Sequence, residues 1–371
     1  MTCPPASAAA IEALKHHAQS VLDADVEHYG TSRSSSSSKR FLSTIITSGT
    51  LQDKVSALTL AIQESPLHNV KAFQSLFALA SKRSRTQAAG ALGALVDLLG
   101  PGSLLPPSRR LRAFSAQPAL LAALRNAAII HWKEGDDLPR PLTDTDLVYW
   151  LYEDWLKEAF FKVVMLLETW TSDEIEFSRM KGIDFVYALL KEKPEQEANL
   201  LRLLVDKLGD RERRVSSRAS FLLLQLQILH PRMKHVIVDT IDKELLLDPA
   251  RGTRARYCAI NTLNQTILSS REPDLVTRLL DIYFKLFSDL LEDRKADGPD
   301  QDGRPAAAKP LNGGPKGGAS RPPQKRHPRK NKPAPASASD NQGPETDEKL
   351  VSAILTGINR AVPFASVVES G

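Results

Sequence analysis

The chain has 371 residues, of which 42% are hydrophobic and only 6% aromatic, and its formal net charge at pH 7 is +5. This length fits one extended solenoid or two globular domains, and the low aromatic content suits helices packed through leucine and alanine. So small a net charge excludes a polycation, and binding to a polyanion would therefore depend on local clusters of arginine and lysine.

The cysteine content and the apolar pattern bear on the compartment of the protein. Cys3 and Cys258 lie far apart, which argues against a disulfide framework and favours a reducing compartment. No apolar stretch approaches the roughly 18 residues needed to span a bilayer, and residues 1–20 lack the pattern of a signal peptide. We therefore expect a soluble intracellular protein.

Residues 1–50 are predicted to form an N-terminal helix, over 8–29, followed by a serine-rich segment. The serines carry basic residues on both sides, and two interpretations stay open. They are a flexible linker, or they are phosphorylated or contact phosphate through their hydroxyl groups. The candidate motif consists of Arg33, Ser34, Ser35, Ser36, Ser37, Ser38, Lys39 and Arg40.

Residues 51–291 are predicted to form a domain of paired helices. Helical periodicity begins at Leu51 and stops at Ser65 and Pro66, and two further helices are expected over 69–80 and 86–99. Residues 100–110 are predicted to be a loop because of their glycine and proline content.

A long helical zone is predicted from Thr143, an N-cap residue with Asp146 at the third helical position. Large apolar side chains follow in this zone. They are too widely spread around a helix to share one narrow face, so we expect at least some of them in the core rather than in a partner-binding stripe. These residues are Trp150, Trp155, Phe160 and Phe161.

The segment 193–231 is predicted to form two amphipathic helices joined by a basic turn around Gly209 and Asp210. Its second apolar stripe recurs 39 residues earlier and 40 residues later. A period near 40 with two helices per unit is typical of HEAT or armadillo repeats, so we predict an all-α fold, an α-solenoid of helical hairpins. The stripe consists of Val215, Ala219, Leu222, Leu226 and Leu229.

Six arginines form a candidate interface near the turns of this repeat. Stacking of the repeats would bring the two groups of three onto one edge, as a basic ridge able to follow RNA phosphates. The alternative is structural, because arginines at such turns also join successive repeats through ion pairs. The six residues are Arg211, Arg214, Arg218, Arg251, Arg254 and Arg256.

Residues 292–349 are rich in proline, glycine and lysine, and are predicted to be a disordered basic linker. Its most basic stretch is interpreted as a nuclear or nucleolar targeting signal, an RNA contact or a solvating linker. The candidates are Arg321, Lys325, Arg326, Arg329, Lys330 and Lys332. Residues 350–371 are expected to start a truncated C-terminal helical region, with a helix that enters something this chain does not contain.

Signals of an enzyme are weak in this sequence. It contains no phosphate-binding glycine loop, no HExxH and no CxxC, and its histidines lack acidic or cysteine partners at metal-ligand spacing. We therefore predict no catalytic residue, no metal site and no cofactor.

Five segments have amino-acid sequences that are more specific than helical periodicity alone: 34–69, 149–164 (YWLYEDWLKEAFFKVV), 193–226, 254–268 and 354–364 (ILTGINRAVPF). They resemble the nucleolar-complex type of ribosome-assembly factor, the family named for its CCAAT-binding-factor domain. The resemblance covers most of the chain that is expected to be ordered. The family's namesake domain would follow residue 365.

The resemblance implies a HEAT-like scaffold in the nucleus and nucleolus that takes part in biogenesis of the large (60S) ribosomal subunit. It implies two kinds of partner: a second helical-repeat protein of the nucleolar complex, and pre-rRNA within pre-60S particles. Two other functions stay open: a transcription regulator that binds CCAAT-box DNA, and a helical-repeat adaptor similar to a transport receptor.

Overall fold

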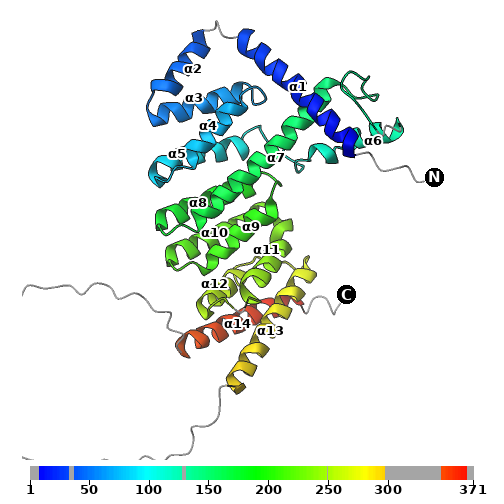
Figure 1. The fold of residues 1–371 in the computed structure, drawn as a ribbon. Coiled ribbons are helices and arrows are strands. Elements are labelled where there is room, and N and C mark those ends of the chain that lie inside the picture. The colour runs from blue at the N-terminus through cyan, green and yellow to red at the C-terminus, as the bar shows by residue number, and fades with distance from the viewer. Residues whose placement is uncertain (1–7, 33–36, 128–130, 249, 297–343, 366–371) are drawn as a thin grey trace, which may run out of the picture.

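In the computed structural model, the structure describes residues 8–32, 37–127, 131–248, 250–296 and 344–365. Within these ranges there are fourteen α-helices and no strand, and successive helices stack into an elongated solenoid (Figure 1). The prediction of an all-α solenoid is therefore confirmed. The helices are α1 Ala8–Ser32, α2 Ser37–Ser48, α3 Leu51–Glu64, α4 Val70–Ala80, α5 Arg85–Leu99, α6 Pro118–Asn126, α7 Asp144–Thr171, α8 Glu176–Leu190, α9 Glu197–Asp206, α10 Arg213–Leu229, α11 Lys234–Ile241, α12 Thr253–Leu263, α13 Pro273–Ala296 and α14 Pro344–Ala365.

Two helices begin at capping boxes that can be read from the sequence. The Thr143 hydroxyl accepts a hydrogen bond from the Asp146 amide, and the Asp146 carboxylate accepts one from the Thr143 amide. Thr50 and Asp53 form the same arrangement at the start of α3. Each box satisfies backbone donors that the first helical turn leaves unpaired, which fixes where the helix starts.

The repeated apolar stripe forms the centre of the stack. Helices α8, α10 and α12 follow one another along the solenoid, with α9 and α11 beside them (Figure 1). The stripe of α10 is buried from Val215 to Leu226, whereas Leu229 at the end of the helix is exposed. The period near 40 therefore identifies the stacked helices correctly, and the apolar stripe identifies their buried residues in α10 except for Leu229.

Helix α7 is the longest helix and takes part in both apolar cores. Its first half packs with α1 and α6, and its second half packs into the larger core that continues to α14. Phe160 is fully buried, whereas Phe161 is 45% exposed. The expectation that at least some of these aromatic residues are core residues is confirmed.

The structure differs from the sequence interpretation at α2. This helix occupies part of the segment that the sequence predicts as serine-rich, where helical periodicity is interrupted. The hydroxyl groups of Thr44, Thr47 and Ser48 donate to the carbonyls four residues earlier, so they bond along the helix instead of ending it. Ile46 packs against the larger core, which ties the helix to its neighbours.

The C-terminal helix also differs from expectation. Helix α14 begins at Pro344 and packs against α12 and α13 of the same chain, so its buried face is covered within the described residues (Figure 1). Leu350 and Ile354 on that face belong to the larger core. The expectation that this helix enters something absent from the chain is wrong for this face.

Arginine–aspartate ion pairs join successive hairpins near the turns before α8, α10 and α12. We call these the ion-pair ladder: Arg85–Asp173, Arg179–Asp210 and Arg251–Asp206. In the middle pair, both side chains are 4% exposed, and the Arg179 guanidinium lies 2.9 Å from the Asp210 carboxylate. The same guanidinium donates to the carbonyls of Asp173 and Glu174, so one buried side chain links two turns of the solenoid.

We predict that Asp210→Ala destabilises the protein by about 3–5 kcal/mol, because it leaves the buried Arg179 without its counter-charge. The free energy of unfolding, measured by urea denaturation, checks this. A matched control is Glu168→Ala, which breaks the exposed 3.4 Å pair with Arg202 and is expected to cost less than about 1 kcal/mol. Equal effects of the two substitutions would contradict the prediction.

We also predict that Gly357→Ala loosens α14, although alanine raises helix propensity by about 1 kcal/mol. A Cβ atom at Gly357 would lie 2.6 Å from the ring of Tyr283 and 2.5 Å from the side-chain oxygen of Asn264. Faster hydrogen exchange of the α14 amides is the expected result. Gly90→Ala is the control, because its Cβ would meet nothing closer than 3.7 Å; unchanged protection of α14 would refute the prediction.

Candidate nucleic-acid and partner interface

Three of the six candidate arginines are held by the chain itself. Arg211 donates to the carbonyl of Glu174 at 2.6 Å, and Arg218 donates to Asp184 at 2.9 Å. Arg251 lies between Asp206, at 2.7 Å, and Asp248, at 3.3 Å. Apart from the Arg251–Asp248 pair, these contacts join residues that are 34–45 positions apart in the chain. They agree with the alternative that these three arginines join successive repeats.

The other three candidate arginines lie in different surroundings. Arg214 and Arg254 are exposed, and within the described residues neither forms an ion pair. Arg256 is partly buried beside α13 and α14, and its Nε atom has no hydrogen-bond partner in the described part of the chain. The six residues therefore do not act alike: Arg214 and Arg254 are the two that are exposed and form no ion pair within the described ranges.

The positions of Arg214 and Arg254 are electrostatically unusual. They are the second residues of α10 and α12, and neither helix has an acidic residue in its first turn. A cation at a helix N-terminus opposes the helix dipole at a cost of about 0.3–1 kcal/mol. Arg213, the first residue of α10, adds a third such charge, which sequence reasoning missed because the start of the helix was not fixed. Two helix starts thus carry three arginines without a neutralising first-turn carboxylate.

A groove of about 420 Å³ runs between α10 and α12, starting at these arginines. Among the described residues, its lining contains one cation, two aromatic rings, hydroxyl groups and side-chain amides, and no carboxylate. The residues are Arg213, Ser216, Ser217, Ser220, Phe221, Tyr257, Cys258, Asn261 and Gln265.

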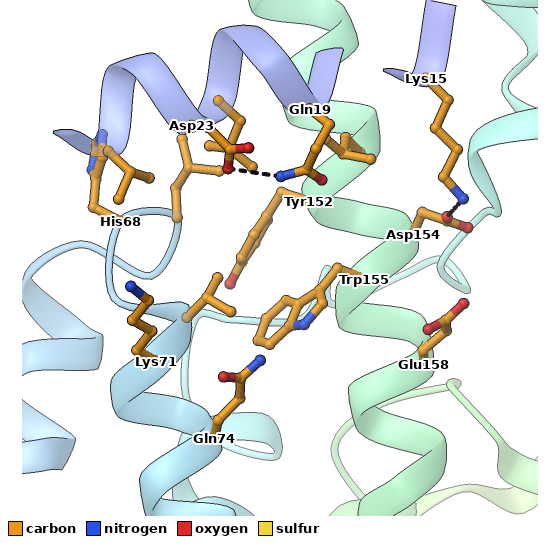
Figure 2. Close-up of a pocket in the computed structure, with 15 residues that line it drawn as sticks. Lys15, Gln19, Asp23, His68, Lys71, Gln74, Tyr152, Asp154, Trp155 and Glu158 are labelled. Atoms are coloured by element: carbon orange, nitrogen blue, oxygen red, sulfur yellow. Dashed lines mark hydrogen bonds and ion pairs between the residues drawn. The ribbon is translucent and has the colours of Figure 1, made fainter. Parts of the chain in front are cut away.

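A second cleft, of about 370 Å³, lies between α1, α4 and α7 (Figure 2). Tyr152 and Trp155 of α7 point into it, with ring centroids 5.6 Å apart. Burial raises the pKa of the Tyr152 phenol. An ion pair between Lys15 and Asp154 joins α1 to α7 beside this cleft, at 2.8 Å. Charged side chains, among them Lys71 and Glu158, line the cleft together with these aromatic rings.

The described residues offer little to a metal or a catalytic mechanism. They contain no group of three histidine, cysteine, aspartate or glutamate side chains that could hold a metal ion. Burial raises the pKa of the Cys258 thiol, which keeps it protonated and poorly nucleophilic. In the same residues no helix is long and apolar enough to cross a membrane.

The remaining predicted sites are only partly within the described chain. The basic stretch 321–332 and residues 33–36 of the serine motif lie outside the described residues. Positions 37–39 are helical, with undescribed side chains, and Arg40 is exposed on α2. These sites stay predictions.

We predict that the Arg251–Asp206 pair makes stability depend on pH. Burial alone would raise the pKa of the Asp206 carboxyl, but Lys207 and Arg251 hold that pKa below its ordinary value. The stabilisation is therefore complete above the unfolded pKa of about 3.9 and is lost as the pH falls through the lower, folded-state pKa. Since the two side chains are 34% and 31% exposed, Asp206→Asn is expected to cost only about 1–2 kcal/mol at pH 7.

Urea denaturation of wild type and variant at pH 7 and at lower pH checks this, and the difference between them should shrink below pH ~4. Asp248→Asn is the control, because Asp248 is the more distant partner of Arg251. A difference that stays constant down to pH 3 would refute the assignment.

Comparison with known proteins identifies relatives along nearly the whole chain. Ribosome biogenesis protein NOC1 of Chaetomium thermophilum is 52% identical over 369 residues, which are 99% of this chain and 34% of that protein. CCAAT/enhancer-binding protein zeta of Mus musculus is 29% identical over 91% of the chain and 26% of its own length. Nucleolar complex protein 1 of Drosophila melanogaster is 30% identical over 69% of the chain and 21% of its length.

No protein-family model matches the chain. The chain spans about a third of the length of the Chaetomium relative and less of the other two. The chain belongs to the nucleolar-complex family of ribosome biogenesis proteins that also includes CCAAT/enhancer-binding protein zeta.

Proposed function

We propose that this chain is part of a nucleolar scaffold in the biogenesis of the large ribosomal subunit, where it binds a second helical-repeat protein and pre-rRNA. The observation that carries the proposal is the 52% identity, over 99% of the chain, to a protein named for ribosome biogenesis. Nuclear and nucleolar localisation is part of the proposal, and the name of the Drosophila relative supports it.

The architecture supports a scaffold. One apolar core continues from α3 to α14, so the stacked hairpins keep fixed distances from one another. The ion-pair ladder adds directional contacts between successive turns, most strongly at the buried Arg179–Asp210 pair. A rigid, elongated surface of this kind can hold two partners in a set relation, and it needs no catalytic group.

Two surfaces support the two kinds of partner. The uncompensated charges of Arg213, Arg214 and Arg254 favour a polyanion, because phosphate contacts supply most of the affinity for nucleic acid. The cleft that contains Tyr152 and Trp155 favours a protein partner, since aromatic side chains dominate the energetics of protein interfaces. The basic stretch 321–332 remains a candidate targeting signal or RNA contact.

One specific observation favours a second function, binding to CCAAT-box DNA: the mouse relative is named CCAAT/enhancer-binding protein zeta. Reading that sequence requires side chains that reach base edges in the major groove of a duplex. The two functions therefore differ in the nucleic acid that each prefers.

We expect native purification of the tagged protein from cells to recover large-subunit precursor RNA together with a second helical-repeat protein. Sequencing of the recovered RNA and mass spectrometry of the recovered proteins measure this, with an untagged strain as the control. Recovery of neither partner would overturn the proposal. Selective retention of the purified protein on a CCAAT duplex, over a scrambled duplex and single-stranded RNA, would favour the DNA-binding function instead.

A further inference from the structure

We propose that the groove between α10 and α12 is a binding site for an unstacked nucleotide of single-stranded RNA, with its base against Phe221 and its phosphate at Arg213. The inference deepens the proposed function and rests on its RNA-binding part. It assigns that part to one groove and to one kind of RNA, whereas the basic ridge predicted from the sequence was only an electrostatic surface.

The polar side chains of the groove are available to a ligand. Within the described residues, the side chains of Arg213, Tyr257, Asn261 and Gln265 make no hydrogen bond or ion pair with the protein. Side-chain amides present a donor and an acceptor together, which is the pattern that nucleobase edges also present. The groove therefore offers hydrogen-bonding groups that can read a base.

Phe221 is a prepared stacking surface. Its side chain is 47% exposed, and the Arg218 guanidinium lies over the ring at 5.5 Å from the centroid. Arg218 is itself held by an ion pair with Asp184. The Phe221 ring therefore packs against a fixed guanidinium and also lines the groove. A ring that is already positioned loses little conformational freedom when a base stacks on it.

Small side chains keep the groove open between its two walls. Ser216, Ser217 and Ser220 line the α10 side. The Thr262 hydroxyl donates to Ser220 at 2.9 Å, which joins α10 to α12 beneath the opening. The space of about 420 Å³ falls in the range of small-ligand sites.

The charge of the groove selects an anion. No carboxylate of the described chain lines it, and Arg214 and Arg254 stand with Arg213 at the starts of the two helices. The nearest acidic side chain in sequence is Glu212, the N-cap residue of α10, which is exposed and does not line the groove. Phosphates are therefore attracted to one end of the groove, while the aromatic and amide groups lie further along it.

This combination favours single-stranded RNA over a phosphorylated peptide. Recognition of a phosphopeptide depends chiefly on clustered arginines around the phosphate. Single-stranded RNA uses all three, because its unstacked bases stack on aromatic side chains and are read by hydrogen bonds.

The test measures binding of a fluorescein-labelled 12-nucleotide single-stranded RNA to the purified chain by fluorescence anisotropy, at several salt concentrations. The same sequence as single-stranded DNA and as an RNA duplex forms the comparison arms. We expect Phe221→Ala to weaken binding of the single-stranded RNA by about 5- to 150-fold, the loss typical of one base–aromatic stack. Arg213→Gln is expected to reduce the slope of log affinity against log salt by about 0.7.

Matched controls separate the groove from general effects. Phe284→Ala removes a phenylalanine that is 52% exposed on α13, and Arg232→Gln removes an exposed arginine beyond the other end of α10. Both should bind RNA as the wild type does. Gln265→Ala changes an exposed side chain of the groove and serves where Phe221→Ala alters folding, which circular dichroism reports.

The outcomes distinguish the two proposals. RNA binding by the wild type that is unchanged in folded Phe221→Ala, Gln265→Ala and Arg213→Gln would overturn the groove and leave the RNA-binding function standing. Absence of RNA binding by the wild type would overturn both. Equal affinity for the DNA strand or the RNA duplex, or displacement of the RNA by a phosphoserine peptide at lower concentration, would overturn the assignment to single-stranded RNA.

Discussion

The buried pair of Arg179 and Asp210 is the interaction on which the arrangement of the solenoid depends. A guanidinium that is 4% exposed must have its lost hydration replaced, and here Asp210 and two backbone carbonyls replace it. Those partners belong to the turns before α8 and α10, and Asp210 lies 31 residues after Arg179 in the chain. Apolar packing alone would tolerate small shifts of one hairpin against the next. The buried charge instead requires one relative position of the two turns, in which Arg179 reaches its partners.

The same turn shows how arginine serves two different ends in this protein. Arg211 reaches back to the carbonyl of Glu174 and strengthens the contact that Asp210 makes. Arg213 and Arg214, a few residues later, pair with no carboxylate of the described residues and stand where the helix dipole disfavours them. Residue type and spacing do not distinguish an arginine that holds the fold from one that leaves its charge on the surface. What distinguishes them is whether an acceptor lies across the turn.

Sequence predicts helices such as α3 and α10 because they carry their own apolar period, and the capping box of Thr143 and Asp146 is local. It misses α2, whose sequence is rich in serine and threonine. It also predicts that α8, α10 and α12 are equivalent, since the stripe around Val215 repeats. It does not predict the covering of α14, because that depends on the contact of Gly357 with Tyr283, 74 positions earlier. The partners of Arg211 and Arg218 are equally non-local, which is why the spacing of the two arginines left their role open.

Helix α10 connects stability with binding. It begins three residues after Asp210 of the buried pair, and its first half forms one wall of the groove. Fixing Asp210 therefore fixes the direction in which Arg213 and Phe221 face α12. Binding to a surface of set geometry costs less ordering than binding to a loop, so a groove with few contacts can still select its ligand. In this chain, the buried Arg179–Asp210 pair fixes the turn, and the fixed turn gives the unpaired Arg213 and Arg214 a defined position at the start of α10.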